Sequence, residues 1–495
     1  MFDLKRQPLR SEREEKRNRR RKRFLVFMLC LFCLVLGMLL GVLFLNSARN
    51  VGSTSSAASV PFSSSPYNEI QRIMNRYWLY GDRYEDLDKE LENKALYGMT
   101  AFDFDPYTTY MSDEEMNSFS DSINGSYVGI GVEYSDMNGN ALILRVFKSS
   151  PAEKAGLQAG DIITYINGEQ VEGMSTQDIK DRVLGIEGTA VTLTIDRGGE
   201  VFDVDVIRGV VNSTVFAYAE DDYIIMELNS FGETTADECK KYLDAYPGYD
   251  KIIIDLRSDS GGYQTAVRDI CGLFIGPNEV YLRQKGIDGT ESADRTPSDS
   301  KKYSFSKIVL LTSEDTASAA EVFAIVLRER CDNVTIVGKT TYGKGVIQTN
   351  RLLSNGGALK ITTYYWYSPD GVSIHEEGVH PDIEVSMPEI YYQYYSDMEE
   401  DEAYAYDSIG EPVRIAQLAL SYLDYEVDRT DGYLSETTEA VLKQYQAENK
   451  LEVSGILDRN TFSSIVALAR RELAGNPEKD PQLIKAKEVI HEDQH

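Results

Sequence analysis

Two segments of the sequence carry residue types that can perform nucleophilic catalysis. The first contains Ser318, which follows a strand predicted over residues 307–312 and lies at the amino end of a helix predicted over 317–330. A serine at the amino end of a helix lies beside free backbone N–H groups and the positive end of the helix dipole, which favour an oxyanion. Ser318 and Glu321 also match the pattern of a helix capping box, so a purely structural role for the serine stays open.

The second segment places a lysine between two glycines, in Gly343-Lys344-Gly345. Glycines let the backbone pack closely around the amine and strip it of water, which lowers its pKa and makes it a base. The alternative is a solvated lysine in a surface turn. A Ser-His-Asp triad needs a histidine, and the folded part offers only His375 and His380. A Ser-Lys dyad needs none, so the sequence favours Ser318 and Lys344 as nucleophile and base.

These two segments lie in a region, residues 213–388, where strand-like and helix-like stretches alternate. Such alternation is typical of an α/β arrangement. Residues 67–119 show helical spacing of apolar side chains instead, and residues 126–208 are short strands with Gly-rich turns and two helical stretches. We therefore expect a helical segment and a small β-rich domain before the α/β core.

The sequence from Ser150 to Gly168, SPAEKAGLQAGDIITYING, resembles the PDZ domain of housekeeping proteases. The resemblance implies that the loop Gly129-Ile130-Gly131-Val132 captures a C-terminal carboxylate through its backbone N–H groups, while the adjacent edge strand pairs with the peptide. The alternative is that these glycines only permit tight turns.

Several motifs in the same order resemble the carboxyl-terminal processing proteases over residues 67–388. They are DPY (105–107), DLRSDSGG (255–262), TASAAE (316–321), TYGKGVIQ (341–348), YSPDG (367–371) and GVHPD (378–382). The resemblance implies a serine endopeptidase in which Ser318 is the nucleophile, Lys344 the general base and Gln348 the residue that orients the lysine. It implies an oxyanion hole formed by Gly261, Gly262 and the amide of Ser318 or its neighbour Ala319. No metal or other cofactor is implied. Where this chain has Asp259-Ser260, members of the family often have Asn-Pro.

Residues 408–472 look like the three-helix peptidoglycan-binding domain of bacterial wall enzymes. The expected partners are therefore protein or peptide substrates with free C-termini and the glycan of the wall. A module that serves only for packing or dimerisation is the alternative, and whether the chain forms a homodimer stays open. The net charge of −29 opposes nucleic-acid phosphate and makes DNA or RNA an unexpected partner.

The N-terminal residues predict a membrane anchor. Residues 1–23 hold eleven Lys or Arg against four acidic residues, and residues 24–45 are uncharged. At about 1.5 Å per residue the uncharged stretch spans roughly 33 Å, enough to cross a bilayer, and the positive-inside rule places the N-terminus in the cytoplasm. A cleaved signal peptide is the alternative. The bulk of the chain is expected outside the cytoplasm, on the wall side of the cell membrane.

Two other classes of protein compete with the protease. One is a catalytically silent PDZ scaffold tethered to the wall. The other is a peptidoglycan amidase or glycosidase, which would need a zinc site or a carboxylate pair.

The predicted fold is an α/β protease core with an inserted β-rich PDZ domain, an N-terminal transmembrane helix and a small all-α C-terminal domain. The predicted boundaries are 1–23 (cytoplasmic), 24–45 (transmembrane), 46–66 (linker), 67–125 (helical part of the protease), 126–208 (PDZ), 209–388 (protease core), 389–407 (acidic linker), 408–472 (peptidoglycan-binding-like) and 473–495 (polar tail).

Overall fold

The structure is a computed structural model, and it describes residues 66–137, 139–148, 150–212, 214–393, 398 and 402–492. No helix within these ranges is both long and apolar enough to cross a bilayer. The membrane helix predicted over 24–45 lies outside them. Contacts divide the chain into one unit over Met1–Asp88 and a second over Lys89–His495.

The described part of the first unit is helical. Helix α2 (Pro66–Tyr77) precedes a short 3-10 helix, η1 (Gly81–Arg83). The Asp88 carboxylate accepts hydrogen bonds from Gln71 at 2.8 Å and Asn75 at 2.5 Å. Helix α3 (Leu87–Thr100) begins at the end of this unit.

In the second unit, the chain reaches the β-rich domain through β1 (Thr109–Met111) and α4 (Asp113–Asn124). Ser112 begins α4 with a full capping box. The backbone amide of Glu115 donates to the Ser112 side chain, and the backbone amide of Ser112 donates to the Glu115 side chain. Gly125 ends the helix in the left-handed conformation, which glycine adopts without strain.

The predicted PDZ region is a sheet with two short helices. Strand β2 (Ser126–Gly129) pairs with β9 (Gly209–Asn212), and the main sheet has the order β3-β4-β5-β7-β8, with β6 beside β5. Strand β3 is therefore an edge, and its Tyr134 hydroxyl donates to the Thr176 carbonyl at the start of α6 at 2.9 Å. The remaining elements are β3 (Val132–Met137), β4 (Asn140–Val146), α5 (Pro151–Lys154), β5 (Ile162–Ile166), β6 (Glu169–Gln170), α6 (Thr176–Val183), β7 (Ala190–Arg197) and β8 (Glu200–Ile207).

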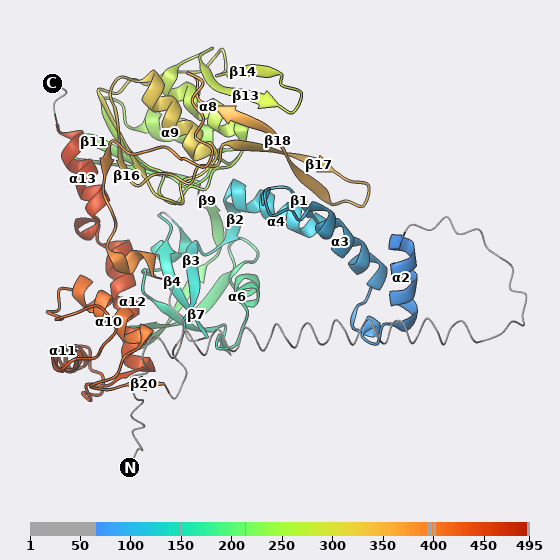
Figure 1. The fold of residues 1–495 in the computed structure, drawn as a ribbon. Coiled ribbons are helices and arrows are strands. Elements are labelled where there is room, and N and C mark those ends of the chain that lie inside the picture. Colours follow the sequence, from blue (N-terminus) through green and yellow to red (C-terminus); the bar gives the residue numbers. More distant parts are fainter. Residues whose placement is uncertain are drawn as a thin grey trace, which may run out of the picture. The chain divides into compact units, whose positions relative to one another are not determined.

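The α/β core is a six-stranded sheet of order β10-β11-β12-β15-β16-β19, parallel except for β10. Its central strands are apolar on both faces, as expected of strands that are covered on both sides. Helices α8 and α9 lie against one face (Figure 1), where Ile254, Leu310 and Phe323 share a core. The elements are β10 (Val215–Glu220), β11 (Tyr223–Leu228), α7 (Thr235–Ala245), β12 (Lys251–Asp255), α8 (Gln264–Ile275), β15 (Lys307–Thr312), α9 (Ala319–Arg330), β16 (Val334–Gly338) and β19 (Ile383–Glu384).

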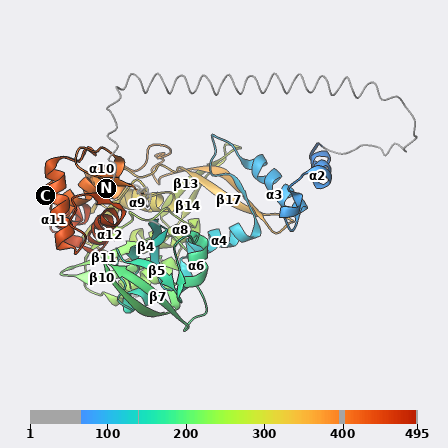
Figure 2. The same ribbon diagram turned by 90° about the horizontal axis from the view of Figure 1, so that it is seen from below.

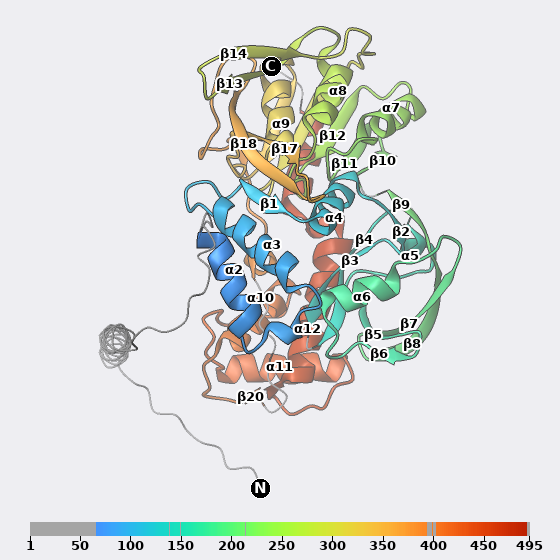
Figure 3. The same cartoon turned by 90° about the vertical axis from the view of Figure 1, so that its right-hand side faces the viewer.

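A second sheet adjoins this core, as Figure 3 shows. Its order is β1-β18-β13-β14, and β17 pairs with β18. Strand β1, from the helical N-terminal part, thereby pairs with a strand some 250 residues later in the chain. The strands are β13 (Val280–Gly286), β14 (Glu291–Arg295), β17 (Val346–Leu352) and β18 (Ala358–Tyr367).

The C-terminal region is helical, with one short pair of strands that the sequence analysis does not include. The pair consists of β20 (Ala403–Tyr404) and β21 (Leu457–Asp458), and the helices are η2 (Glu389–Tyr392), α10 (Glu411–Tyr422), α11 (Glu436–Glu448) and α12 (Arg459–Gly475). Its core includes Leu142 from β4 of the PDZ region. Helix α12 of this region lies beside β4 (Figure 2).

The sequence predicts a polar tail over 473–495, whereas the structure has a helix there. After η3 (Pro477–Lys479), helix α13 (Pro481–Ile490) covers the other face of the α/β sheet (Figure 1). Leu483 and Ile490 pack there against Ile253 and Leu311. Four apolar side chains lie on one side of this helix. The many charged residues between and around them made their helical spacing hard to recognise in the sequence.

Candidate active site

Ser318 lies where β15 has ended and α9 begins. It is half-buried, and its backbone has φ 56° and ψ −117°. Few residues other than glycine adopt a positive φ, and such strain gathers at functional sites. The Ser318 amide donates to Glu321 Oε2 at 2.8 Å, a bond expected of a capping box. The capping interaction is therefore present, but Ser318 also has a positive φ, which a helix cap alone does not require.

Lys344 lies in the loop before β17, and the glycines beside it allow a close approach. A Cβ at Gly345 would lie 2.5 Å from the Cβ of His375, and Gly343 has φ 89°. Burial and, to a smaller extent, the positive charge of Lys360 lower the pKa of Lys344 to about 8, and the charge of Glu321 opposes this shift. Its Nζ lies 5.0 Å from the centre of the Tyr107 ring.

One cavity of about 470 Å³ is lined by all the residues predicted to form the dyad, to orient its lysine and to form the oxyanion hole. These residues are Ser318, Lys344, Gln348, Gly261, Gly262 and Ala319. Helix α4 also contributes to the lining through Phe119, Ser122 and Ile123. Neither His375 nor His380 lines the cavity.

Glu321 is a functional candidate whose full role the sequence does not reveal. It is completely buried, and its two carboxylate oxygens accept four hydrogen bonds. The donors are the amides of Ser318, Gly343 and Lys344 and the hydroxyl of Thr341. Burial raises the pKa of Glu321, and these hydrogen bonds oppose that rise. Glu321 thus fixes the Lys344 loop against the turn that carries Ser318.

The Gly261-Gly262 turn adjoins Ser318 closely. A Cβ at Gly261 would lie 2.8 Å from the Cβ of Ser318, so only glycine fits. The Gly261 amide donates to Asp259 Oδ1 at 2.7 Å. Among the described residues, no acceptor is found for the Gly262 or the Ala319 amide, and both residues line the cavity. These two amides are therefore available to a ligand.

Asp259 itself is fully buried, and its Oδ2 has no hydrogen-bond partner in the described part of the chain. Burial raises the pKa of this carboxyl well above its usual range. Burial thus favours the neutral carboxyl over the carboxylate, and a neutral carboxyl is close in shape and charge to the asparagine that the family often has here. The Asp-for-Asn difference therefore preserves the turn.

Gln348 lies on β17, at a bulge in its pairing with β18. Its side-chain amide donates to the Thr362 hydroxyl at 3.4 Å, a long bond. Gln348 and Lys344 share the cavity, and the orienting role stays a prediction.

The predicted carboxylate-binding loop of the PDZ region lies outside this cavity. Ile130 is buried in the domain core, and Gly131 has φ 82°, with its missing Cβ only 2.4 Å from the Cβ of Ser150. The glycine is therefore required by the local backbone, as the structural alternative supposes. The loop also adjoins the edge strand β3, so peptide binding there stays a prediction.

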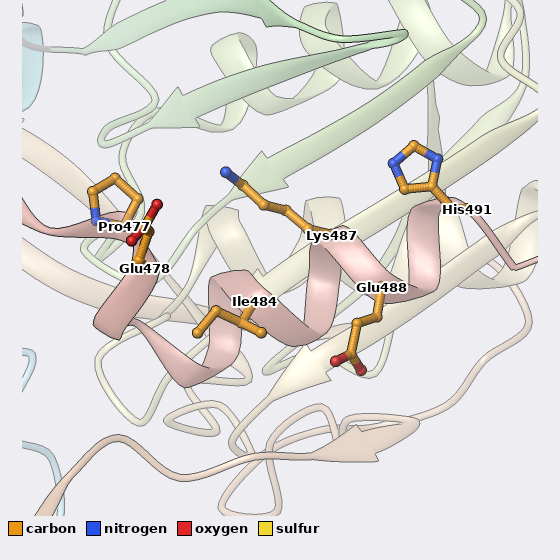
Figure 4. A pocket seen from close by; sticks show the side chains of 6 residues that line it. All are labelled: Pro477, Glu478, Ile484, Lys487, Glu488 and His491. Atoms are coloured by element: carbon orange, nitrogen blue, oxygen red, sulfur yellow. The ribbon is translucent and has the colours of Figure 1, made fainter.

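A second hollow of about 490 Å³ lies along α13 and shares no residue with the first. Figure 4 shows Ile484, Lys487, Glu488 and His491 there. Lys487 pairs with Glu220 at 2.5 Å, so its charge is compensated. This arrangement offers no nucleophile with an adjacent base.

Comparisons with known proteins agree with the architecture. The peptidase family S41 model matches residues 222–385, the PDZ domain model 142–197, and the peptidoglycan binding domain model 409–465. The "Probable CtpA-like serine protease" of Staphylococcus haemolyticus strain JCSC1435 is 31% identical over 439 residues, which cover 87% of this chain and 88% of that protein. The chain belongs to peptidase family S41.

A second relative of this S41 peptidase is the "Carboxy-terminal processing protease CtpA" of Bacillus subtilis strain 168. It is 30% identical over 454 residues, which cover 90% of this chain and 94% of that protein. Among solved structures, the photosystem II D1 C-terminal processing protease is 23% identical, with a TM-score of 0.39. The match covers 66% of this chain and 93% of the chain of that protease. The S41 peptidase described here is a carboxy-terminal processing serine protease with a PDZ domain, as predicted from the sequence.

Proposed function

We propose that the protein cleaves peptide bonds with a Ser318-Lys344 dyad. The observation that carries this proposal is the single cavity lined by Ser318 and by a lysine whose pKa is lowered to about 8. A base with such a pKa is largely unprotonated at mildly alkaline pH, whereas an exposed lysine titrates near 10.4.

In this mechanism, Ser318 Oγ attacks the carbonyl carbon of the scissile bond while its proton passes to Lys344 Nζ. The amides of Gly262 and Ala319 donate to the oxyanion that forms, because the Gly261 amide is already bound to Asp259. The C–N bond then breaks, and Lys344 gives its proton to the leaving amine. A water molecule attacks the resulting ester, and Lys344 takes a proton from it. The bond between the carbonyl carbon and Ser318 Oγ then breaks, Lys344 returns the proton to Oγ, and the acid product leaves.

The dyad is tested on the full chain in detergent with an unfolded protein substrate. Ser318→Ala is expected to lower kcat by about a thousandfold or more, and Lys344→Arg by about a hundredfold or more, because a guanidinium does not deprotonate in this range. In the wild type, kcat/KM is expected to rise with pH through about 8. Substantial Ser318-dependent turnover by Lys344→Arg would mean that another group takes the serine proton.

We further propose that substrates are selected by a free C-terminus bound to the PDZ domain at Gly129-Ile130-Gly131-Val132 and along the edge strand β3. The exposed position of β3 at the end of its sheet supports pairing with a peptide. Substrates with a free or an amidated C-terminus provide the test. Equal kcat/KM for both would contradict this selection.

We propose that residues 24–45 anchor the protease in the cell membrane with its bulk on the wall side, and that residues 408–472 bind peptidoglycan. The charge asymmetry of the N-terminus and the peptidoglycan binding domain match over 409–465 support this location. Protease treatment of intact wall-less cells should remove the region after the span. The full chain should pellet with purified sacculi but not after muramidase digestion. Protection of that region from the protease would contradict the membrane anchor. Pelleting that does not require intact sacculi would contradict peptidoglycan binding.

A further inference from the structure

The charge of the catalytic cavity is opposite to that of the protein. The chain carries a net charge of −29, yet none of the residues that line the cavity is acidic. Two of them, Lys344 and Lys360, are lysines. Lys344 belongs to the proposed dyad, whereas Lys360 transfers no proton in that mechanism and acts on it only by lowering the pKa of Lys344.

Lys360 lies on β18 between two neighbouring strands. It faces Thr109 of β1 on one side and Asn350 of β17 on the other, and Asn350 also lines the cavity. Its side chain is half-buried, and its Nζ lies 5.0 Å from the centre of the Phe119 ring of α4. The strand and the helix thus hold the ammonium group at the cavity wall.

No carboxylate compensates the charge of Lys360 within the described residues. Burial is the cause that lowers its pKa, and no acidic neighbour opposes that shift. By contrast, Lys251, Lys285 and Lys339 form ion pairs at 2.7, 3.0 and 2.8 Å. A half-buried cation without a counterion destabilises the fold, so its presence in a binding cavity indicates that the ligand supplies the anion.

We propose that Lys360 binds a carboxylate of the substrate, so that the protease prefers an acidic peptide in its cavity. The carboxylate comes either from an Asp or Glu side chain near the scissile bond or from the substrate's own C-terminus. This inference rests on the proposed peptidase site, because it concerns the same cavity.

The test uses peptides built around a cleavage site that the full chain makes in an unfolded protein. Each position that flanks this bond carries Glu or Gln in turn, and every peptide is made with a free and with an amidated C-terminus. At one position, kcat/KM for Glu is expected to exceed that for Gln by roughly tenfold, as for one charged hydrogen bond. If the C-terminal carboxylate is the ligand, amidation causes the loss instead.

Lys360→Met should reduce that preference to about one, and Lys360→Glu should reverse it. The matched control is Lys285→Met, on the neighbouring strand β13 but outside the cavity lining, which should keep the full preference. Ratios are compared within one enzyme at one pH, because Lys360 also lowers the pKa of Lys344 and its loss shifts the pH profile. An equal change for acidic and neutral peptides would overturn the proposal.

Binding to the Ser318→Ala chain separates this inference from the dyad. Fluorescence anisotropy should give a Kd roughly tenfold lower for the preferred carboxylate peptide than for its neutral partner. The difference should vanish in Ser318→Ala/Lys360→Met. Equal Kd values in Ser318→Ala would reject the carboxylate site, whereas selective binding without Ser318-dependent cleavage in the wild type would reject only the proposed function.

Discussion

At the scale of single residues, the geometry of the site depends on a buried carboxylate that takes no part in bond cleavage. Glu321 holds the Ser318 turn and the Lys344 loop through four hydrogen bonds, although these segments are more than twenty residues apart. Such bonds to a buried charge are stronger than neutral ones, and each donor that loses its acceptor is left unsatisfied. The relative placement of nucleophile and base therefore depends on Glu321 remaining an acceptor at both oxygens.

Glu321→Gln should consequently impair both folding and catalysis. The new amide NH₂ would face two donors, so we expect a loss of about 2–4 kcal/mol of stability and a fall in kcat larger than any change in KM. Thermal unfolding and steady-state kinetics measure these quantities. Unchanged kcat in a folded Glu321→Gln enzyme would show that the carboxylate does not position the dyad.

Asp259 gives a prediction for stability against pH. Because the folded-state pKa is raised, the folded chain binds a proton that the unfolded chain has already released above about pH 3.9. This residue therefore lowers stability as the pH rises from there toward the folded-state pKa. Asp259→Asn removes the titration and still accepts from the Gly261 amide.

Asp259→Asn should match the wild type near pH 4 and gain about 1.4 kcal/mol per pH unit above it, until the folded-state pKa is reached. Denaturant unfolding at several pH values provides the comparison. A stability difference that is constant with pH would mean that Asp259 is ionised in the folded protein.

At the scale of elements, the sequence predicts best what depends on local pattern. The strand, turn and helix around Ser318 and the glycines beside Lys344 were all predictable, because apolar runs and glycine restrict the local backbone. The bonds of Glu321 to the Lys344 loop and the position of Lys360 beside Phe119 were not. They depend on the approach of segments far apart in sequence, and a Ser-x-x-Glu pattern or a single lysine contains no information on that approach.

Helix α13 lies where the sequence predicts a polar tail. Leu483→Ala should destabilise the protein by about 2–4 kcal/mol, because this side chain is 8% exposed and packs on the sheet that carries β12 and β15. Its neighbour Ile484 is 37% exposed, so Ile484→Ala should change stability by less than about 0.5 kcal/mol. Thermal unfolding compares the two, and equal effects would contradict the docking of α13.

At the scale of the second unit, the C-terminal region is joined to both the PDZ region and the protease core. Helix α12 packs against β4, and Asp480, at the start of α13, accepts from Arg257 at 2.7 Å. Arg257 lies just before the turn that holds Gly261 and Gly262, and it also pairs with Asp255. The region is thus part of the protease architecture, whatever it binds on its outer surface.

Gly160→Ala tests the contact between the PDZ region and α12. A Cβ at this position would lie 2.7 Å from the Ala467 carbonyl and 2.6 Å from the Cβ of Arg471. The matched control is Gly168→Ala, since Gly168 has a similar φ of 81° against 85° but no atom within 4 Å of its added Cβ. Both variants carry the same backbone strain of about 1 kcal/mol, and only Gly160→Ala adds the clash.

Hydrogen exchange should therefore accelerate in α12 for Gly160→Ala and stay unchanged there for Gly168→Ala. The Gly160 variant should also lose more stability, by roughly 1–3 kcal/mol. Identical exchange in the two variants would show that α12 does not depend on this contact.

Activation of Ser318 by an unprotonated lysine should make the rate at which a fluorophosphonate phosphonylates this serine depend on pH. A fluorophosphonate probe reacts with the full chain at a series of pH values, and peptide mapping identifies the labelled residue. The account predicts labelling of Ser318 at a rate that rises through an apparent pKa of about 8, and no such rise in Lys344→Arg. Labelling at another residue, or a rate that rises through about 6.5 as for a histidine base, would contradict it.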